Sequence, residues 1–189
     1  MTPQRYPIRL IAGVAVLATT VLAAGVVVGY RLGSHKKAPP TAAATLAADF
    51  AQLETKLHAA VGVVVSPVGN GQAPITLGSW KSGRAWSTIK VPLIIAALRG
   101  ENPPTVTDAM TAAITESDNA AAESIWAGLG DPVTAAQKVE AVLKQTGDLT
   151  TVQSQKVLPE FTAFGQTEWS LTDQVRFTSV AFCDKANAP

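Results

Sequence analysis

The sequence is poor in the residues that hold metals and disulfides. Its 189 residues include one cysteine, Cys183, and two histidines, His35 and His58. One cysteine cannot close a disulfide within the chain, and without a Cys/His cluster there is no metal-ligand spacing. No glycine-rich phosphate loop or other cofactor motif is present. The sequence therefore predicts no metal site and no cofactor.

An excess of charge of one sign is also lacking. Fifteen basic and fourteen acidic side chains give a net charge of +1. There is no basic surplus to attract nucleic acid and no acidic run of the kind found in disordered tails. The length suits one domain with an attached segment better than two full domains.

One long stretch carries no charge at all. Leu10 to Tyr30 contains 21 uncharged residues, enough to cross a hydrocarbon core of about 30 Å as a helix. We expect a retained membrane anchor within residues 1–32 and a Pro-containing linker over residues 33–44. A cleaved signal peptide is the alternative, with Ala42-Ala43-Ala44 as candidate small residues for cleavage. A buried core helix is a third interpretation, which the length of the stretch disfavours.

The remainder, residues 45–189, begins with a helical pattern and a hairpin pattern. The run Val61–Val65 and the segment Ile75–Trp80, with Gly69-Asn70-Gly71 between them, predict two paired strands. Before them, four apolar residues recur at helical spacing, which predicts a helix with one apolar face. These residues are Leu46, Phe50, Leu53 and Leu57.

Further helices are predicted along the rest of the chain. One follows Trp86, and another covers Ala120 to Leu129. A third starts with Asp131 as N-cap and Pro132 at the first helical position, and Gly147 ends it. The order of helix, hairpin and several helices indicates the α+β class. The apolar face of the third helix comprises Val133, Ala136, Val139 and Leu143, and a capping box at Ser170-Leu171-Thr172-Asp173 predicts a last helix with Val175 and Phe182.

The segment Ser87-Thr88-Ile89-Lys90 contains the first candidate catalytic pair. On a helix, side chains three residues apart share a face, so Ser87 and Lys90 can touch. A serine hydroxyl is a weak nucleophile until a base removes its proton, and a lysine buried among apolar neighbours can be that base. Unpaired N–H groups at the helix start would suit a developing oxyanion. The alternative is an N-cap serine and a lysine that extends to solvent, and this short pattern alone favours that alternative.

A second polar motif, Ser117-Asp118-Asn119, follows roughly thirty residues later and precedes a helical pattern. Locally it has an ordinary explanation, because Ser, Asp and Asn are common at helix starts. Thr115 and Asp118 also have the spacing of a capping box. The motif by itself therefore favours helix capping over catalysis.

With their flanks, the two motifs resemble the first and second active-site motifs of class A β-lactamases and related penicillin-binding proteins. The matching segments are Trp86-Ser87-Thr88-Ile89-Lys90-Val91-Pro92-Leu93 and Ala113-Ile114-Thr115-Glu116-Ser117-Asp118-Asn119-Ala120-Ala121-Ala122. The resemblance runs from about Leu46 to the C-terminus and includes Gly147-Asp148. It implies an α+β fold of the β-lactamase/DD-peptidase type, here an incomplete sheet plus a helical region, preceded by one transmembrane helix.

The resemblance also implies a role for each motif residue. Ser87 matches the acylated nucleophile, and Lys90 the residue that helps to activate it. Ser117 matches the serine that relays a proton to the leaving nitrogen. Asn119 matches the residue that binds the substrate amide, and Asp118 would hold the loop. The implied partners are β-lactams or peptidoglycan stem peptides ending in D-Ala-D-Ala, met by a membrane-attached domain outside the cytoplasm.

The sequence departs from the family in three places. The two motifs are closer together than in typical members, with Asn102-Pro103-Pro104 between them, which would open one rim of the cleft. The third motif, Lys-Thr-Gly on a strand lining the cleft, does not occur after Asn119. The deacylating glutamate is not recognisable either, because neither Glu160 nor Glu168 begins Glu-x-x-Leu-Asn, and both read as solvated loop charges.

These departures predict a C-terminally truncated domain, either a fragment or a remnant. We expect it to hydrolyse β-lactams very slowly or not at all, because one backbone oxyanion donor and the deacylating base are missing. The alternative is a non-catalytic, membrane-anchored binding or remnant domain. A weaker alternative is a helical membrane-anchored protein in which the motifs are coincidental.

Overall fold

The computed structural model describes residues 41–68, 73–101 and 103–183. Within these ranges it contains six α-helices, two short 3-10 turns and four strands. Contacts within the chain group Thr45–Pro189 into one compact unit and Met1–Ala44 into another. Of the first unit only residues 41–44 are described, so the fold below is that of the second.

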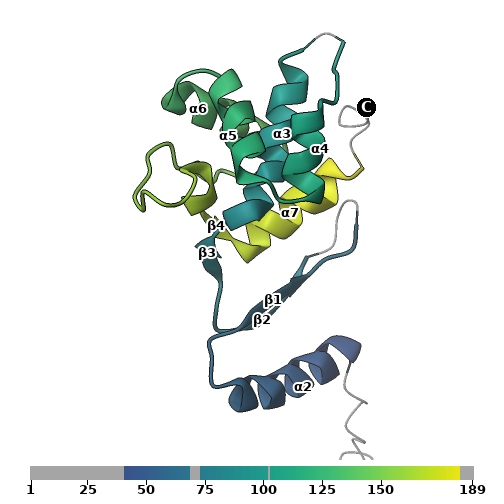
Figure 1. Cartoon of the computed structure of the whole chain (residues 1–189). Helices are drawn as coiled ribbons and strands as arrows, with labels where there is room; N and C mark the ends of the chain where they lie inside the picture. The colour runs from purple at the N-terminus through teal and green to yellow at the C-terminus, as the bar shows by residue number, and fades with distance from the viewer. Residues whose placement is uncertain (1–40, 69–72, 102, 184–189) are drawn as a thin grey trace, which may run out of the picture. The chain divides into compact units, whose positions relative to one another are not determined.

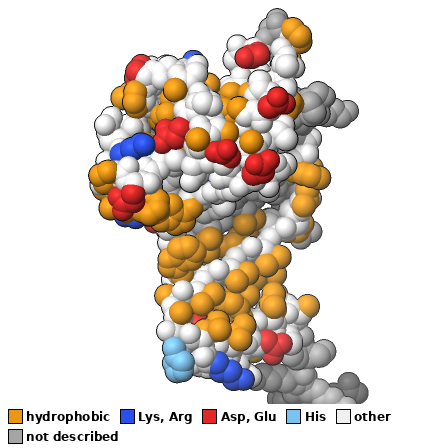
Figure 2. Space-filling view, viewed as in Figure 1, with side chains coloured by type: hydrophobic (Ala, Val, Ile, Leu, Met, Phe, Trp, Pro, Cys, Tyr) orange, Lys and Arg blue, Asp and Glu red, His pale blue; other side chains and the backbone are white. Residues whose placement is uncertain are grey.

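The predicted first helix and hairpin are present. Helix α2 covers Ala42–Leu57, and strand β1 (Gly62–Val65) pairs antiparallel with β2 (Ile75–Gly78). The register places Gly62 opposite Gly78 and Val65 opposite Ile75, while the predicted turn at 69–71 lies outside the described residues. The apolar face predicted for α2 is not buried, because no residue of this helix is buried. Figure 2 shows hydrophobic side chains at the surface of α2 and the hairpin.

The predicted single, incomplete sheet is wrong. Among the described strands there are two separate two-stranded sheets, β1–β2 and β3–β4. Strand β3 (Ser82–Arg84) runs antiparallel to β4 (Glu168–Ser170), which joins segments far apart in the sequence. These strands of three or four residues are too short to form the wide layer that the predicted architecture needs.

The transmembrane helix of the predicted fold is also corrected. No helix within the described ranges is long and apolar enough to cross a membrane. The segment Leu10 to Tyr30, on which that prediction rests, lies outside the described residues. The fold that the structure supports is therefore α+β with six helices and two small sheets, and none of the described helices could span a membrane.

Most of the domain is helical (Figure 1). Helix α3 (Lys90–Arg99) contacts three other helices, namely α4 (Asp108–Thr115), α5 (Asn119–Gly128) and α6 (Pro132–Gln145). The 3-10 turn η1 (Trp86–Ile89) leads into α3 and contacts a second turn, η2 (Phe164–Gln166). The last helix, α7 (Leu171–Ala181), follows β4 and contacts β1. The shared core includes Ile89, Leu93, Ala122, Val139, Leu143, Phe164, Trp169 and Phe177.

The predicted caps of the last two helices are confirmed. Asp131 caps α6 by accepting hydrogen bonds from Val133 N (3.0 Å) and Thr134 N (3.2 Å), with Pro132 at the first position. Gly147 has φ +79°, which is the left-handed conformation expected just after a helix end. Ser170 caps α7 by accepting from Asp173 N at 3.0 Å.

Two of the predicted positions are wrong, namely Val133 on the buried face of α6 and Phe182 within the last helix. Val133 is exposed, whereas the other three residues predicted for its face, Ala136, Val139 and Leu143, are buried. Phe182 lies just past the end of α7 and is 82% exposed, and Phe177 is the buried aromatic residue of that helix. Both errors fall at a helix end, where a side chain has a helical turn of its own helix on one side only.

Candidate active site

The segment with Ser87 begins as a 3-10 turn and continues as an α-helix. Ser87 is the second residue of η1, and Lys90 is the first residue of α3. Ile89 and Leu93 are fully buried in the core, which fixes the orientation of the whole segment. Ala85, not Ser87, is the N-cap residue of the turn, so the interpretation of Ser87 as an ordinary capping serine is excluded.

Lys90 has a buried amino group. The residue is 2% exposed, although it begins a helix, and its Nζ donates to the backbone oxygen of Ser117 (2.7 Å) and to Ser117 Oγ (3.2 Å). The alternative of a lysine that extends to solvent is therefore wrong. Burial lowers the pKa of Lys90 from its ordinary value of 10.5, and the negative charge of Asp118 partly opposes this shift.

Ser117 joins the two residues of the first motif. Its Oγ lies 2.9 Å from Ser87 Oγ and also accepts from Lys90 Nζ. No hydrogen bond joins the side chains of Ser87 and Lys90 directly among the described residues, so the predicted direct contact is replaced by a bridge through Ser117. Ser87 and Ser117 are both exposed, whereas Lys90 lies beneath them. The structure thus brings together three of the predicted site residues.

The turn between α4 and α5 determines where Ser117 lies. Ser117 has φ +56°, a left-handed conformation that is uncommon for a residue with a Cβ atom. The next residue, Asp118, is the N-cap of α5, and its Oδ1 accepts from Ala120 N (2.7 Å) and Ala121 N (3.0 Å). The predicted capping box with Thr115 is wrong, because Thr115 Oγ1 donates to Thr111 O instead. Capping therefore explains Asp118 but leaves the position of Ser117 unexplained.

Asn119 is the first residue of α5 and is exposed. In the described part of the chain no hydrogen bond holds its side chain amide, which leaves both the oxygen and the nitrogen available to a ligand. Its place two residues after Ser117 is consistent with the amide-binding role that the resemblance implies.

One backbone donor lies beside the hydroxyl of the candidate nucleophile, Ser87. In η1 the first internal bond is from Thr88 N to Ala85 O (3.1 Å). The N–H of Ser87 precedes this bond and has no partner within the described residues. Such a donor at the start of a helical segment is suited to the oxygen that becomes negative when a carbonyl is attacked.

The long segment between Gly147 and η2 is held by two buried polar side chains. Asp148 accepts from Trp169 Nε1 (2.7 Å) and Thr150 N (2.9 Å). Gln166 accepts from Leu158 N (2.7 Å) and donates to Leu158 O (3.0 Å). These bonds explain the Gly-Asp pair noted in the sequence, whereas the role of Gln166 has no sequence signal.

The two glutamates of this region do not contact the site residues. Glu160 is exposed, and Glu168 is exposed on β4, where its Oε1 accepts from Ser82 Oγ at 2.5 Å. Neither has a hydrogen bond to Ser87, Lys90 or Ser117. The structure therefore offers neither of these two glutamates as a deacylating carboxylate.

Three residues beside Ser87 escaped the sequence analysis. The rings of Trp86 and Phe161 meet edge to face, with centroids 4.9 Å apart, although 75 positions separate them in the sequence (161 minus 86). The guanidinium carbon of Arg84 lies 5.6 Å from the centroid of the Trp86 ring. No periodicity could pair Phe161 with Trp86, because the contact depends on how the 148–166 segment folds back.

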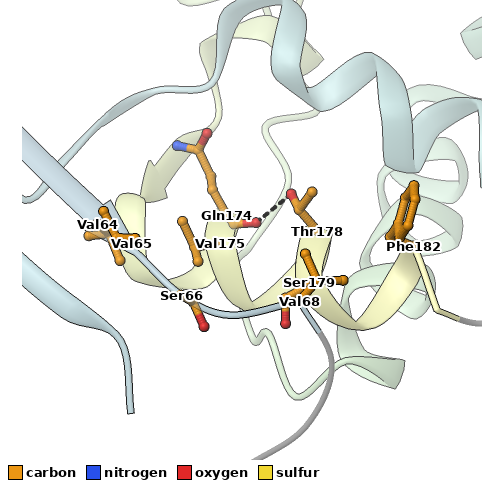
Figure 3. Close-up of a pocket in the computed structure, with 9 residues that line it drawn as sticks. All are labelled: Val64, Val65, Ser66, Val68, Gln174, Val175, Thr178, Ser179 and Phe182. Carbon is orange, nitrogen blue, oxygen red and sulfur yellow. Dashed lines mark hydrogen bonds between the residues drawn. The ribbon is translucent and has the colours of Figure 1, made fainter. Parts of the chain in front are cut away.

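A separate groove lies between the end of β1 and α7 (Figure 3). It has a volume of about 520 Å³ and is lined mainly by apolar side chains. None of the predicted site residues lines it. The lining residues are Val64, Val65, Ser66, Val68, Gln174, Val175, Thr178, Ser179 and Phe182.

Comparison of the sequence with protein-family models and with curated proteins finds no match. The resemblance to β-lactamases and penicillin-binding proteins therefore stays a prediction from the two motifs. The geometry adds that Ser87, Ser117 and Lys90 form one connected chain of polar groups.

Proposed function

We propose that this chain is a serine acyl-transfer domain of the β-lactamase and penicillin-binding type, with Ser87 as the nucleophile. The observation that supports it best is the chain of polar groups from Ser87 Oγ to Ser117 Oγ (2.9 Å) and on to the buried Lys90 Nζ (3.2 Å). An exposed hydroxyl joined through a second hydroxyl to a buried amine is the arrangement that activates a serine. The proposed substrates are β-lactams or D-Ala-D-Ala stem peptides, which would be met outside the cytoplasm.

Acylation would proceed by attack of Ser87 Oγ on the carbonyl carbon of the substrate amide. The proton of Ser87 passes to Ser117 Oγ as the proton of Ser117 passes to neutral Lys90 Nζ. Burial favours the neutral amine because it lowers the pKa of Lys90. The N–H of Ser87 stabilises the oxyanion. Asn119, two residues after Ser117, binds the substrate amide.

Collapse of the tetrahedral intermediate would break the carbon–nitrogen bond. The leaving nitrogen takes a proton from Ser117 Oγ, which recovers one from Lys90, so the protonation state of the site is restored. The acyl-enzyme then waits for a water molecule to attack. Neither Glu160 nor Glu168 has a hydrogen bond to Ser87, Lys90 or Ser117, so the described contacts place no glutamate of this region where it could activate that water. A long-lived acyl-enzyme, which is the behaviour of a penicillin-binding protein, is therefore favoured over rapid hydrolysis.

The test is covalent labelling of the full-length chain with a fluorescent penicillin. A mild detergent would keep the uncharged N-terminal stretch in solution. We expect slow, stoichiometric labelling, with the acyl group located on the peptide that contains Ser87 by mass spectrometry. Hydrolysis should be far below the ~10 s⁻¹ that is typical of enzymes. Ser87→Ala should abolish labelling.

A matched control is Ser124→Ala, because Ser124 is also an exposed serine on a helix, in the middle of α5, with its Oγ donating to Ala121 O. This variant should be labelled like the wild type. Equal labelling of the wild type and of Ser87→Ala would refute Ser87 as the nucleophile. Absence of any label on a chain that circular dichroism shows to be folded would favour the alternative, a binding domain without acyl transfer.

A further inference from the structure

Arg84, Trp86 and Phe161 form a small exposed surface directly before the candidate nucleophile. Trp86 precedes Ser87 in the chain and is 45% exposed, and Phe161 is 40% exposed. The two rings meet edge to face at 4.9 Å, with an interplanar angle of 63°. Arg84 places its guanidinium carbon 5.6 Å from the centre of the Trp86 ring. We name these three side chains the aromatic platform.

The backbone holds the platform in place at a cost. Trp86 has φ +50°, a left-handed conformation that is unfavourable for a residue with a Cβ atom. On the other side, Phe161 is fixed by its N–H bond to Leu158 O (3.2 Å) and by the Gln166 side chain, which donates to Leu158 O and also accepts from Leu158 N. Strained positions of this kind are concentrated at binding and catalytic sites.

The chemistry of the platform defines a class of ligand. An arginine stacked on an aromatic ring keeps the N–H groups at the edge of its guanidinium free for two parallel bonds to a carboxylate. Arg84 forms no ion pair within the described part of the chain. The carboxylate opposite it in the sheet register, Glu168, is engaged by Ser82. The exposed surfaces of Trp86 and Phe161 can in turn pack against a flat apolar group.

We infer that the aromatic platform is a recognition site for an acyl compound that carries both a carboxylate and an aromatic group. Arg84 binds the carboxylate, and Trp86 and Phe161 bind the aromatic group. This inference rests on the proposed function, because the platform selects the compound whose carbonyl Ser87 attacks. It goes further by naming the part of the site that sets specificity.

The test separates binding from acylation by using Ser87→Ala as the background. Binding of N-phenylacetylglycine and of its methylamide, which lacks the carboxylate, is measured by titration calorimetry on the full-length chain. Trp86→Gly removes the ring and suits the positive φ, Trp86→Phe retains a ring, and Arg84→Gln removes the charge. The matched control is Phe182→Ala, which removes an exposed aromatic ring outside the platform.

We expect Trp86→Gly to weaken binding of both compounds about tenfold, and Trp86→Phe to restore most of it. Arg84→Gln should weaken binding of N-phenylacetylglycine by about tenfold or more while leaving the methylamide unchanged. Phe182→Ala should alter neither. Since Arg84 is exposed and outside the core, its variant keeps the test valid if Trp86→Gly disturbs the turn.

The outcomes also distinguish the two proposals. If N-phenylacetylglycine does not bind, or binds equally to every variant, the platform is not a recognition site. If binding depends on Trp86 and Arg84 but penicillin does not label Ser87 in the wild type, the platform stands and the acyl-transfer proposal fails. Labelling of Ser87 without platform-dependent binding would sustain the proposed function and overturn this inference.

Discussion

Ser117 is the residue at which stability and chemistry should oppose each other. Its φ of +56° costs a residue with a Cβ atom about 1–2 kcal/mol relative to the right-handed region. Ser117→Ala keeps this cost and loses the hydroxyl that bonds to Ser87 and Lys90, which should destabilise the domain by about 1 kcal/mol. Ser117→Gly loses the same hydroxyl but relieves the backbone strain. That gain is reduced by about 0.5–1 kcal/mol, because glycine has more conformational freedom in the unfolded chain.

Ser117→Gly should therefore unfold at a higher urea concentration than Ser117→Ala, by a free energy of about 0.5–1 kcal/mol, with an unchanged slope. Both variants should acylate about 10²–10⁴ times more slowly than the wild type, because both lack the relay to Lys90. Urea titrations and the rate of labelling by fluorescent penicillin measure the two effects separately. If Ser117→Ala proves as stable as Ser117→Gly, the backbone argument is incorrect. If either variant is labelled at the wild-type rate, Ser117 does not relay the proton.

Other predictions concern the buried polar groups and the caps. Labelling should accelerate as pH rises through the lowered pKa of Lys90, with a midpoint below 10.5, and Lys90→Met should be slow at every pH. Between that pKa and 10.5 the folded state binds fewer protons than the unfolded state, so the free energy of unfolding of the wild type should rise with pH across this window. Lys90→Met should lack this rise. Urea titrations at several pH values measure both. Asp118→Ala should cost about 1 kcal/mol as a lost cap, and Asp131→Ala should lower the melting temperature without affecting labelling. Asp148→Ala should cost about 1–3 kcal/mol in urea unfolding, because it leaves the indole N–H of Trp169 buried without a partner, and an unchanged midpoint would refute this.

Sequence patterns predicted correctly those elements that depend on residues close together in the chain. The hairpin from Val61, the cap at Asp131 and the cap at Ser170 depend on residues within a turn or two of each other, and all three are confirmed. The sheet arrangement could not be predicted in this way, because β3 finds its partner 86 residues later (Ser82 to Glu168). Nothing in the three-residue segment Ser82–Arg84 specifies that partner, and two-stranded pairs of this size draw their stability from the core around them.

The candidate site shows the same division. The spacing of Ser87 and Lys90 correctly placed both residues on one short segment, but it suggested a direct contact, whereas the structure routes the contact through Ser117. The burial of Lys90 could be anticipated from Leu93 and the isoleucines that follow, because an apolar segment draws its first turn into the core, although Val91 itself is exposed. The meeting of Trp86 with Phe161 could not, since it depends on the path of a segment that has no regular secondary structure over most of its length.

The helix-capping and catalytic interpretations of the second motif need not compete, because adjacent residues account for each. Asp118 must have an extended backbone to cap α5, and its φ of −62° and ψ of 119° satisfy this requirement. The chain leaves α4 only two residues earlier, so the reversal between the helices falls on Ser117, which takes the left-handed conformation. That conformation is associated with a carbonyl and a hydroxyl that both face Lys90 Nζ. The cap thus contributes to the geometry of the polar chain, and the acidity of Asp118 moderates the pKa of the lysine that the turn helps to bury. In this motif the cap accounts for Asp118, whereas the left-handed conformation of Ser117 accounts for the two contacts with Lys90 on which the proposed relay depends.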